Sequence, residues 1–236
     1  MAANAEVLRR SELIDSSAQE TELGRFGASR TTNDWNPEVF AREQIRGLVR
    51  RVFFANGVQP AKQVVFSAAE TNTDVSGICD QVGRALALET SGDIAIMSRN
   101  ARVEQMARPY FHYGKSSAIK SRSTQVAINL WRVPEFGVRE SGGESGTGPY
   151  WLSCLADLRN EFEYSVIHGP VAGMSSEAAM LGQLADGIVL VLGAHSTRRA
   201  AARKIKETLE AAQSRILGTV LSERKFPVPD RIYRRL

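Results

Sequence analysis

Apolar residues follow two patterns along this chain, short continuous runs and helical spacings, and the two patterns alternate. Continuous runs are typical of strands buried on both faces, and here they cover residues 63–67, 93–97, 125–133, 164–167, 187–192 and 215–221. Helical spacing covers residues 37–55, 78–91, 150–162, 175–184 and 196–212. This alternation predicts a single α/β domain with a mostly parallel sheet of about six or seven strands, flanked by helices.

Polar and glycine-rich stretches lie before and between these elements. Residues 1–35 carry few large apolar side chains, so we predict a disordered leader followed by one folded domain over residues 36–236. The stretch SGGESGTGP, residues 141–149, lies between a predicted strand and a predicted helix, where a phosphate-binding loop can occur. Because no Lys-Ser/Thr pair follows it, we predict a flexible connection.

Composition narrows the class of protein. No apolar run approaches the ~18 residues of a membrane span, which predicts a cytoplasmic protein whose membrane contact goes through a partner. Cys79 and Cys154 stand far apart and in no metal-ligand spacing, so we predict reduced core thiols and no metal site. The formal net charge of +4 permits acidic partners without demanding them.

The first predicted strand leads into a loop of special interest, VVFSAAETNTDVSG, residues 64–77. An apolar run ends in small and polar residues, and an amphipathic helix follows, which is the layout of a phosphate-binding loop. Such a loop needs glycines so that backbone N–H groups can surround the phosphates, and a lysine that reaches them. Both the glycines and the lysine are missing here.

The C-terminal half carries the most specific markers, Leu184-Ala185-Asp186-Gly187 and Ile216-Leu217-Gly218-x-Val220-Leu221. With the order of segments, these make residues 37–236 resemble the cytoplasmic domain of bacterial tyrosine kinases (BY-kinases) of capsule and exopolysaccharide synthesis. Those kinases belong to the MinD/ParA-like branch of P-loop ATPases. The resemblance implies a P-loop-type fold, an ATP site and a membrane polysaccharide co-polymerase as partner.

The nucleotide-binding loop of that family looks like Ser-Ala-x-x-Pro-Gly-Glu-Gly-Lys-Ser/Thr. By resemblance, the nucleotide-binding positions here are Asn72, Thr73, Asp74, Val75 and Ser76, and only Ser76 keeps the family's residue type. Asp74 would place a carboxylate beside a phosphate, and two unit charges ~4 Å apart repel by roughly 4 kcal/mol at an effective dielectric of 20.

The family's acidic magnesium and catalytic positions are also replaced. They correspond here to Ser98, Asn100 and His168, and an adenine-contacting asparagine corresponds to Ser222. Three elements altered together predict no catalytic residue, no bound metal and no ATP or magnesium cofactor. Weak nucleotide binding without magnesium stays open. His168 is either a structural residue in the vacated magnesium site or a ligand or general base.

Two further family features are present in part. Glu43, Arg46 and Arg50 resemble the family's Glu-x-x-Arg-x-x-Arg oligomerisation motif, with the last arginine displaced by one position. The tyrosine cluster that relatives phosphorylate at the C-terminus is reduced here to Tyr233. The resemblance therefore implies self-association through the first helix and one candidate phosphorylation site.

The predicted helix over residues 196–212 is basic and carries Arg198, Arg199, Arg203, Lys204 and Lys206. A solvated face is the ordinary explanation, and binding of an acidic partner or of nucleic acid is the alternative. No aromatic residues are interleaved with these cations to favour binding of single strands, and we expect nucleic acid to be the less suitable ligand.

These observations favour a catalytically degenerate BY-kinase-like protein that regulates or scaffolds exopolysaccharide synthesis. Its partner would be a polysaccharide co-polymerase or adaptor, an active BY-kinase relative, or a second copy of itself. One alternative is an active or weakly active kinase or ATPase in which Lys62, Lys115 or Arg99 replaces the missing lysine. Another is a ParA-like protein that associates with nucleic acid through the basic helix.

Overall fold

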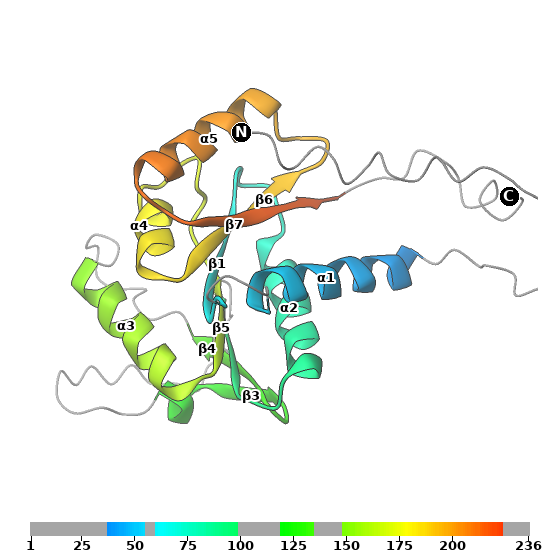
Figure 1. Ribbon diagram of the computed structural model, residues 1–236, viewed down its shortest axis with the longest axis vertical. Helices are drawn as coiled ribbons and strands as arrows, with labels where there is room; N and C mark the ends of the chain where they lie inside the picture. Colours follow the sequence, from blue (N-terminus) through cyan, green and yellow to red (C-terminus); the bar gives the residue numbers. More distant parts are fainter. Residues whose placement is uncertain (1–36, 55–59, 99–118, 135–147, 224–236) are drawn as a thin grey trace, which may run out of the picture. The chain divides into compact units, whose positions relative to one another are not determined.

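The computed structural model describes residues 37–54, 60–98, 119–134 and 148–223 of the chain (Figure 1). The elements in these ranges are α1 (Pro37–Phe53), β1 (Gln63–Ala68), α2 (Val75–Glu89), β2 (Ile94–Ser98), a short 3-10 helix η1 (Ile119–Arg122), β3 (Thr124–Ala127), β4 (Leu130–Pro134), α3 (Gly148–Glu161), β5 (Tyr164–His168), α4 (Glu177–Leu184), β6 (Gly187–Gly193), α5 (Arg199–Ala211) and β7 (Ile216–Ser222).

The strands form one seven-stranded sheet in the order β3-β4-β2-β5-β1-β6-β7. All neighbouring strands run parallel except β3 and β4, which are antiparallel. The predicted α/β fold with a mostly parallel sheet is therefore confirmed. After β1 the chain crosses over β5 to reach β2, and later it returns to the other side of β1 to form β6. In parallel α/β sheets, ligands bind beyond the carboxyl ends of the strands at such a reversal.

Helices cover both faces of the sheet. Helices α1 and α2 lie on one face, and α3, α4 and α5 lie on the other (Figure 1). Successive residues of β1 supply the two layers in turn: Val64 and Phe66 pack under α1 and α2, whereas Val65 packs under the other three helices. Because both faces are buried, the strands read as continuous apolar runs.

The predicted strand over residues 125–133 is wrong, because this stretch forms the hairpin β3–β4. Asn129 makes the turn, and its side-chain amide donates to the carbonyls of Ala87 and Thr90, at 3.2 and 2.8 Å. These contacts with the end of α2 hold the chain in a reversal. Val126, on the edge strand β3, and Ile128, in the turn, are exposed. Their apolar side chains are therefore not part of the core, although the sequence pattern predicted a buried strand.

The other predicted strands and helices are present with shifted ends. Helix α5 begins at Arg199 rather than at 196, because residues 194–198 form a turn after β6. Thr197 closes this turn through its hydroxyl, which accepts from the Gly193 N–H at 3.0 Å. Helix α3 begins at Gly148, so the last two residues of the predicted loop 141–149 belong to its first turn.

Several predictions fall outside the described residues, namely the leader over residues 1–35, most of the loop at 141–149, and the positions Arg99, Asn100, Lys115 and Tyr233. The domain boundary at residue 36 stays a prediction. None of the helices in the described ranges combines the length and the hydropathy needed to cross a bilayer.

Candidate functional site

The loop between β1 and α2 emerges at the carboxyl edge of the sheet, where a phosphate-binding loop belongs. Its start is fixed to the neighbouring strand, because the Ala69 N–H donates to the Val191 carbonyl at 2.9 Å. Thr71 and Asn72 then turn outward and are exposed. The predicted nucleotide-binding positions 72–76 thus lie together at the end of the central strand and at the start of α2.

Asp74 is the N-cap of α2. Its carboxylate accepts a hydrogen bond from the Gly77 N–H at 2.9 Å. The first N–H groups of a helix have no partner within the helix and lie at the positive end of its dipole, so a carboxylate satisfies them well. A Cβ built on Gly77 would collide with this carboxylate. The chain therefore uses its own anion at the place where a phosphate-binding loop holds a phosphate.

Val75, which the resemblance predicts at the position of the family's lysine, is turned inward. It is 2% exposed and packs in the apolar layer beneath α1 and α2. Ser76 follows it and is half-buried. The first residue of α2 thus contributes to the core, and no charged side chain can occupy this position without displacing packed apolar groups.

The other predicted positions converge on the same edge. His168 is the last residue of β5, and it is in register with Phe66 of β1. Ser98 is the last residue of β2, the strand on the other side of β5. Ser98 and His168, which were singled out from the sequence, therefore both lie at carboxyl ends of strands, on the same edge of the sheet as the loop. Asn100, the third of these positions, lies outside the described residues.

A turn after β5 packs against the carboxyl end of β1. The sequence did not predict this packing. The Ser67 hydroxyl donates to the Pro170 carbonyl, and the Ala172 N–H donates to the Ala68 carbonyl at 2.8 Å. A Cβ on Gly173 would approach the Ala69 carbonyl oxygen to 2.6 Å, so only glycine allows this packing. The paired glycines of the GPVAG stretch were the available signal for this close approach.

The structure excludes one of the three proposed replacements for the lysine. Lys62 immediately precedes β1, so it lies at the amino edge of the sheet. A strand of six residues separates it from the loop, about 20 Å at ~3.3 Å per residue. The two other candidates fall outside the described residues. Within the described ranges, no group of three or more His, Cys, Asp or Glu side chains is placed to hold a metal ion.

Asp186, one of the sequence markers, has a structural role at the amino edge. Its carboxylate accepts from the backbone N–H groups of Lys62 and Gln63, at 2.7 and 2.8 Å, and from the Arg159 guanidinium at 2.9 Å. Burial alone would raise the pKa of this carboxyl group, but the three hydrogen bonds outweigh it and hold the pKa below its usual value. The next residue, Gly187, has φ +156°, and a Cβ there would lie 2.6 Å from the Arg215 carbonyl oxygen.

Asp93 is a second carboxylate with a lowered pKa, and it also precedes a strand at the amino edge. The Lys120 ammonium donates to it at 2.5 Å and the Trp131 indole at 3.0 Å, and these bonds hold the pKa of the Asp93 carboxyl group down against partial burial. Carboxylates with perturbed pKa values often mark active sites. Here both belong to ion pairs that join elements on the side of the sheet opposite to the loop.

The three α1 residues predicted for oligomerisation make contacts within the chain. Arg46 pairs with Glu43 at 2.9 Å, and Arg46 and Arg50 reach Glu89 at the end of α2, at 3.5 and 3.1 Å. Glu43 and Arg50 remain largely exposed. These pairs help to join α1 to α2, and the oligomerisation role stays a prediction.

Strand order and loop position together define the fold class, an α/β domain in which a loop and a helix follow a central strand of a mostly parallel sheet. No family model matches the sequence. Among characterised proteins, the tyrosine-protein kinase CpsD of Streptococcus agalactiae is 32% identical over 74 residues, 31% of this chain and 32% of that protein. The tyrosine-protein kinase YwqD of Bacillus subtilis is 38% identical over 77 residues, 32% of each. These matches span about a third of the length of those relatives.

A longer and weaker match covers 81% of this chain and 87% of the putative tyrosine-protein kinase CapB of Staphylococcus aureus, at 21% identity. The predicted resemblance to bacterial tyrosine kinases is therefore confirmed.

Solved structures agree on the fold. The kinase domain of the Escherichia coli tyrosine kinase ETK superposes with a TM-score of 0.57 at 13% identity, covering 80% of this chain and 79% of that one. The VpsO kinase domain gives a TM-score of 0.55 at 18% identity and covers 80% and 98% of the two chains. MinD of Aquifex aeolicus gives 0.54 at 13% identity, with 70% of each chain covered. At these identities the likeness concerns the fold alone.

Proposed function

We propose that this chain is a catalytically inactive relative of the bacterial tyrosine kinases, which regulates or scaffolds capsule or exopolysaccharide synthesis by binding other proteins. One observation carries the proposal: the Asp74 carboxylate caps the start of α2, where a nucleotide phosphate would have to bind. The comparison with tyrosine kinases supports the relationship, and the altered loop supports the loss of catalysis.

The physical case against ATP rests on two effects at the same place. A carboxylate ~4 Å from a phosphate opposes binding by roughly 4 kcal/mol at an effective dielectric of 20. Val75, which replaces the lysine, lies in the core and offers no positive charge in return. Phosphoryl transfer depends on positioned cations more than on any covalent chemistry, so the loss of the lysine and of the acidic magnesium ligands removes most of the catalysis.

The resemblance also supports the choice of partners. A membrane polysaccharide co-polymerase or its adaptor would bring the chain to the membrane surface, and an active BY-kinase relative would be regulated by it directly. A second copy of the chain is the third candidate, through Glu43, Arg46 and Arg50 of α1.

The proposal is tested by a thermal-shift titration with ATP and ADP, with and without magnesium. A ligand at 100 times its dissociation constant adds roughly 2.7 kcal/mol of stability, which is an easily measured shift. We expect no shift at millimolar nucleotide. A shift that requires magnesium would contradict the proposed loss of the site.

Activity provides the second arm of this test. We expect no ATP hydrolysis above background in the presence of magnesium. Robust hydrolysis that disappears in Ser76→Ala, but persists in the matched variant Ser91→Ala, would show a working nucleotide site. Ser91 is a suitable control because it is exposed and lies between α2 and β2 at the other edge of the sheet.

Self-association is tested by sedimentation of the full chain. We expect the mass of the wild-type protein to exceed that of one chain, and the double variant Arg46→Ala/Arg50→Ala to sediment as a monomer. The double variant Arg42→Ala/Arg51→Ala removes the same charge from the same helix and should keep the assembly. A wild-type protein that sediments as a monomer would remove this part of the proposal.

A further inference from the structure

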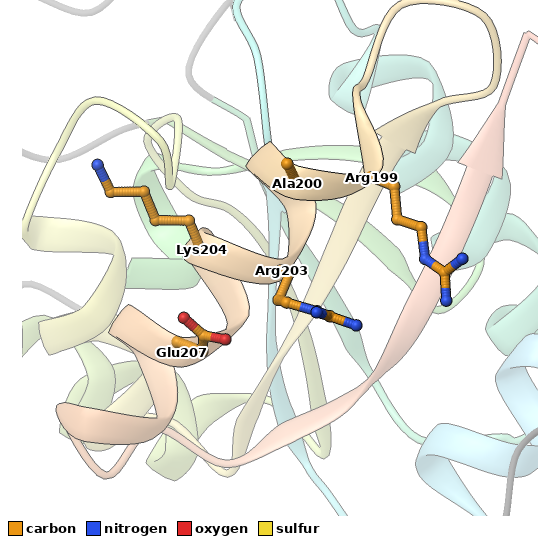
Figure 2. A pocket seen from close by; sticks show the side chains of 5 residues that line it. All are labelled: Arg199, Ala200, Arg203, Lys204 and Glu207. Carbon is orange, nitrogen blue, oxygen red and sulfur yellow. The ribbon is translucent and has the colours of Figure 1, made fainter.

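Helix α5 carries a wide-open surface of mainly charged side chains on its outer side. The described residues that line it all belong to this helix: Arg199, Ala200, Arg203, Lys204 and Glu207 (Figure 2). We call this surface the α5 groove. Figure 2 shows Arg199 and Arg203 extending on one side of the helix and Lys204 on the other. The small side chain of Ala200 leaves space between them.

The cations of the α5 groove are exposed and unneutralised. In the described part of the chain, no carboxylate lies within ion-pair distance of Arg199, Arg203 or Lys204, although Glu207 is only one turn away. Lys206, on the same helix but outside the groove, does pair with Glu210 at 3.3 Å. The opposite side of α5 is anchored by the buried Ile205 and Leu209, so the groove faces solvent.

The charges of α5 are ordered against the helix dipole. Three of its four cations, Arg199, Arg203 and Lys204, lie in its first half, and the acidic residues Glu207 and Glu210 lie in its second half, whereas acidic residues near the N-terminus and basic residues near the C-terminus would stabilise a helix. The dipole adds to the positive potential of the arginines and to the negative potential of the glutamates. This arrangement costs helix stability and produces a surface with a positive end and a negative end.

We propose that the α5 groove docks an acidic segment of a partner polypeptide. Its carboxylates would bind at Arg199, Arg203 and Lys204, where each guanidinium group can donate two parallel N–H bonds to the two oxygens of one carboxylate. A uniform polyanion such as DNA would meet Glu207 and Glu210 at the other end of the same face. An anionic membrane would find no exposed large apolar side chain on α5 to insert. This proposal does not rest on the proposed function, because the α5 groove does not include the β1–α2 loop.

The test uses the full chain and a fluorescently labelled glutamate-rich peptide, with anisotropy measured over a series of salt concentrations. Arg199→Ala and Arg203→Ala should each weaken binding about threefold, and the double variant about tenfold. Lys206→Ala is the matched control, since it removes the same charge from the same helix outside the groove. It should change the affinity by less than about twofold. Glu207→Gln should bind the peptide more tightly.

The competing ligands form the other arms of the test. Random-sequence duplex DNA and vesicles of phosphatidylcholine with phosphatidylglycerol are compared with the peptide at the same ionic strength. Tighter binding of either than of the peptide, or equal losses in Arg203→Ala and Lys206→Ala, would overturn the proposal. Absence of peptide binding at millimolar concentration would overturn it as well. None of these results depends on whether the chain binds nucleotide, so the two proposals fail separately.

Discussion

At the scale of single residues, two aspartates organise opposite edges of the sheet through backbone N–H groups. Asp74 caps α2 at the carboxyl edge, and Asp186 fixes the start of β1 at the amino edge. Sequence reasoning identified Asp74 as a repelling charge but missed its capping role, although an aspartate before a helix is a common N-cap. Asp186 was identified only as a marker, because its hydrogen bonds reach a strand more than a hundred residues away in the chain.

Replacing Asp74 tests the cap. Asp74→Ala should lower the free energy of unfolding by about 1 kcal/mol, because the Gly77 N–H loses its acceptor, whereas Asp74→Ser should be close to wild type. Urea unfolding measures the free energy of unfolding of both variants. Asp157→Ala, at an exposed aspartate in the middle of α3, is the control and should cost less than about 0.5 kcal/mol. Equal stability of Asp74→Ala and the wild type would show that the cap contributes nothing.

Asp186 predicts a dependence of stability on pH. The folded-state pKa of its carboxyl group lies below the unfolded value of about 3.9, so its contribution is present above that pH and is lost as the pH falls through the folded pKa. Asp186→Asn should therefore be less stable than the wild type at neutral pH, by about 1–3 kcal/mol, and the difference should shrink in acid. Urea unfolding between about pH 6 and pH 3 measures this. A difference that stays constant over this range would contradict the assigned role.

At the scale of elements, helix positions followed from periodicity, whereas their ends depended on local chemistry. Helix α5 ends in a left-handed residue, Gln213, with φ 57°. The next N–H group, of Ser214, donates back to the Leu209 carbonyl at 2.9 Å, as in a Schellman ending. Glycine is the usual residue in this conformation, because a Cβ strains it. The sequence carried no glycine there, so this ending was not predictable from turn chemistry.

Gln213→Gly should therefore stabilise the chain, by about 0.5–1 kcal/mol, because it relieves the strain of the left-handed conformation. Gln213→Ala keeps a Cβ and should stay within about 0.5 kcal/mol of the wild type. Thermal unfolding of the three proteins gives the comparison. A lower melting temperature for the glycine variant would mean that the Gln213 side chain contributes more than its backbone costs.

The β3–β4 hairpin shows why periodicity failed at one element. A stretch of nine residues rich in apolar and β-branched side chains matches one buried strand, but the turn at Ile128 and Asn129 depends on the Asn129 amide reaching carbonyls at the end of α2. These two hydrogen bonds join residues about 40 positions apart in the chain. The local spacing of apolar residues therefore could not predict them. An edge strand also needs no second buried face, which is why its apolar residues are exposed.

At the scale of the whole domain, two apolar layers lie on either side of the sheet, and each contains one cysteine. Cys79, on α2, is fully buried in the layer formed with α1, and Cys154, on α3, is 6% exposed in the layer formed with α4 and α5. Burial raises the pKa of Cys154 to about 12, with a further rise from nearby Asp157. Burial raises the pKa of the Cys79 thiol as well, with Asp80 adding to it.

These thiols should report whether the two layers unfold together. Both should be nearly unreactive toward Ellman's reagent in the native protein, since the thiolate is the reactive form and neither sulfur is accessible. Labelling rates at increasing urea, measured on Cys79→Ser and Cys154→Ser separately, should rise together if unfolding is cooperative. One thiol that reacts well before the other would show that its layer opens locally.

The sequence by itself determined the alternation of strands and helices, the two buried faces and the residue types in the loop between β1 and α2. Each of these follows from the spacing of apolar residues or from the identity of a few consecutive ones. The strand order, the packing of the turn after β5 on Ser67 and the solvent-facing side of α5 were decided only by the tertiary structure. They depend on contacts between segments far apart in the chain, such as Ser67 with Pro170, 103 positions away. Local periodicity cannot encode such pairings, because many strand orders bury the same apolar runs equally well.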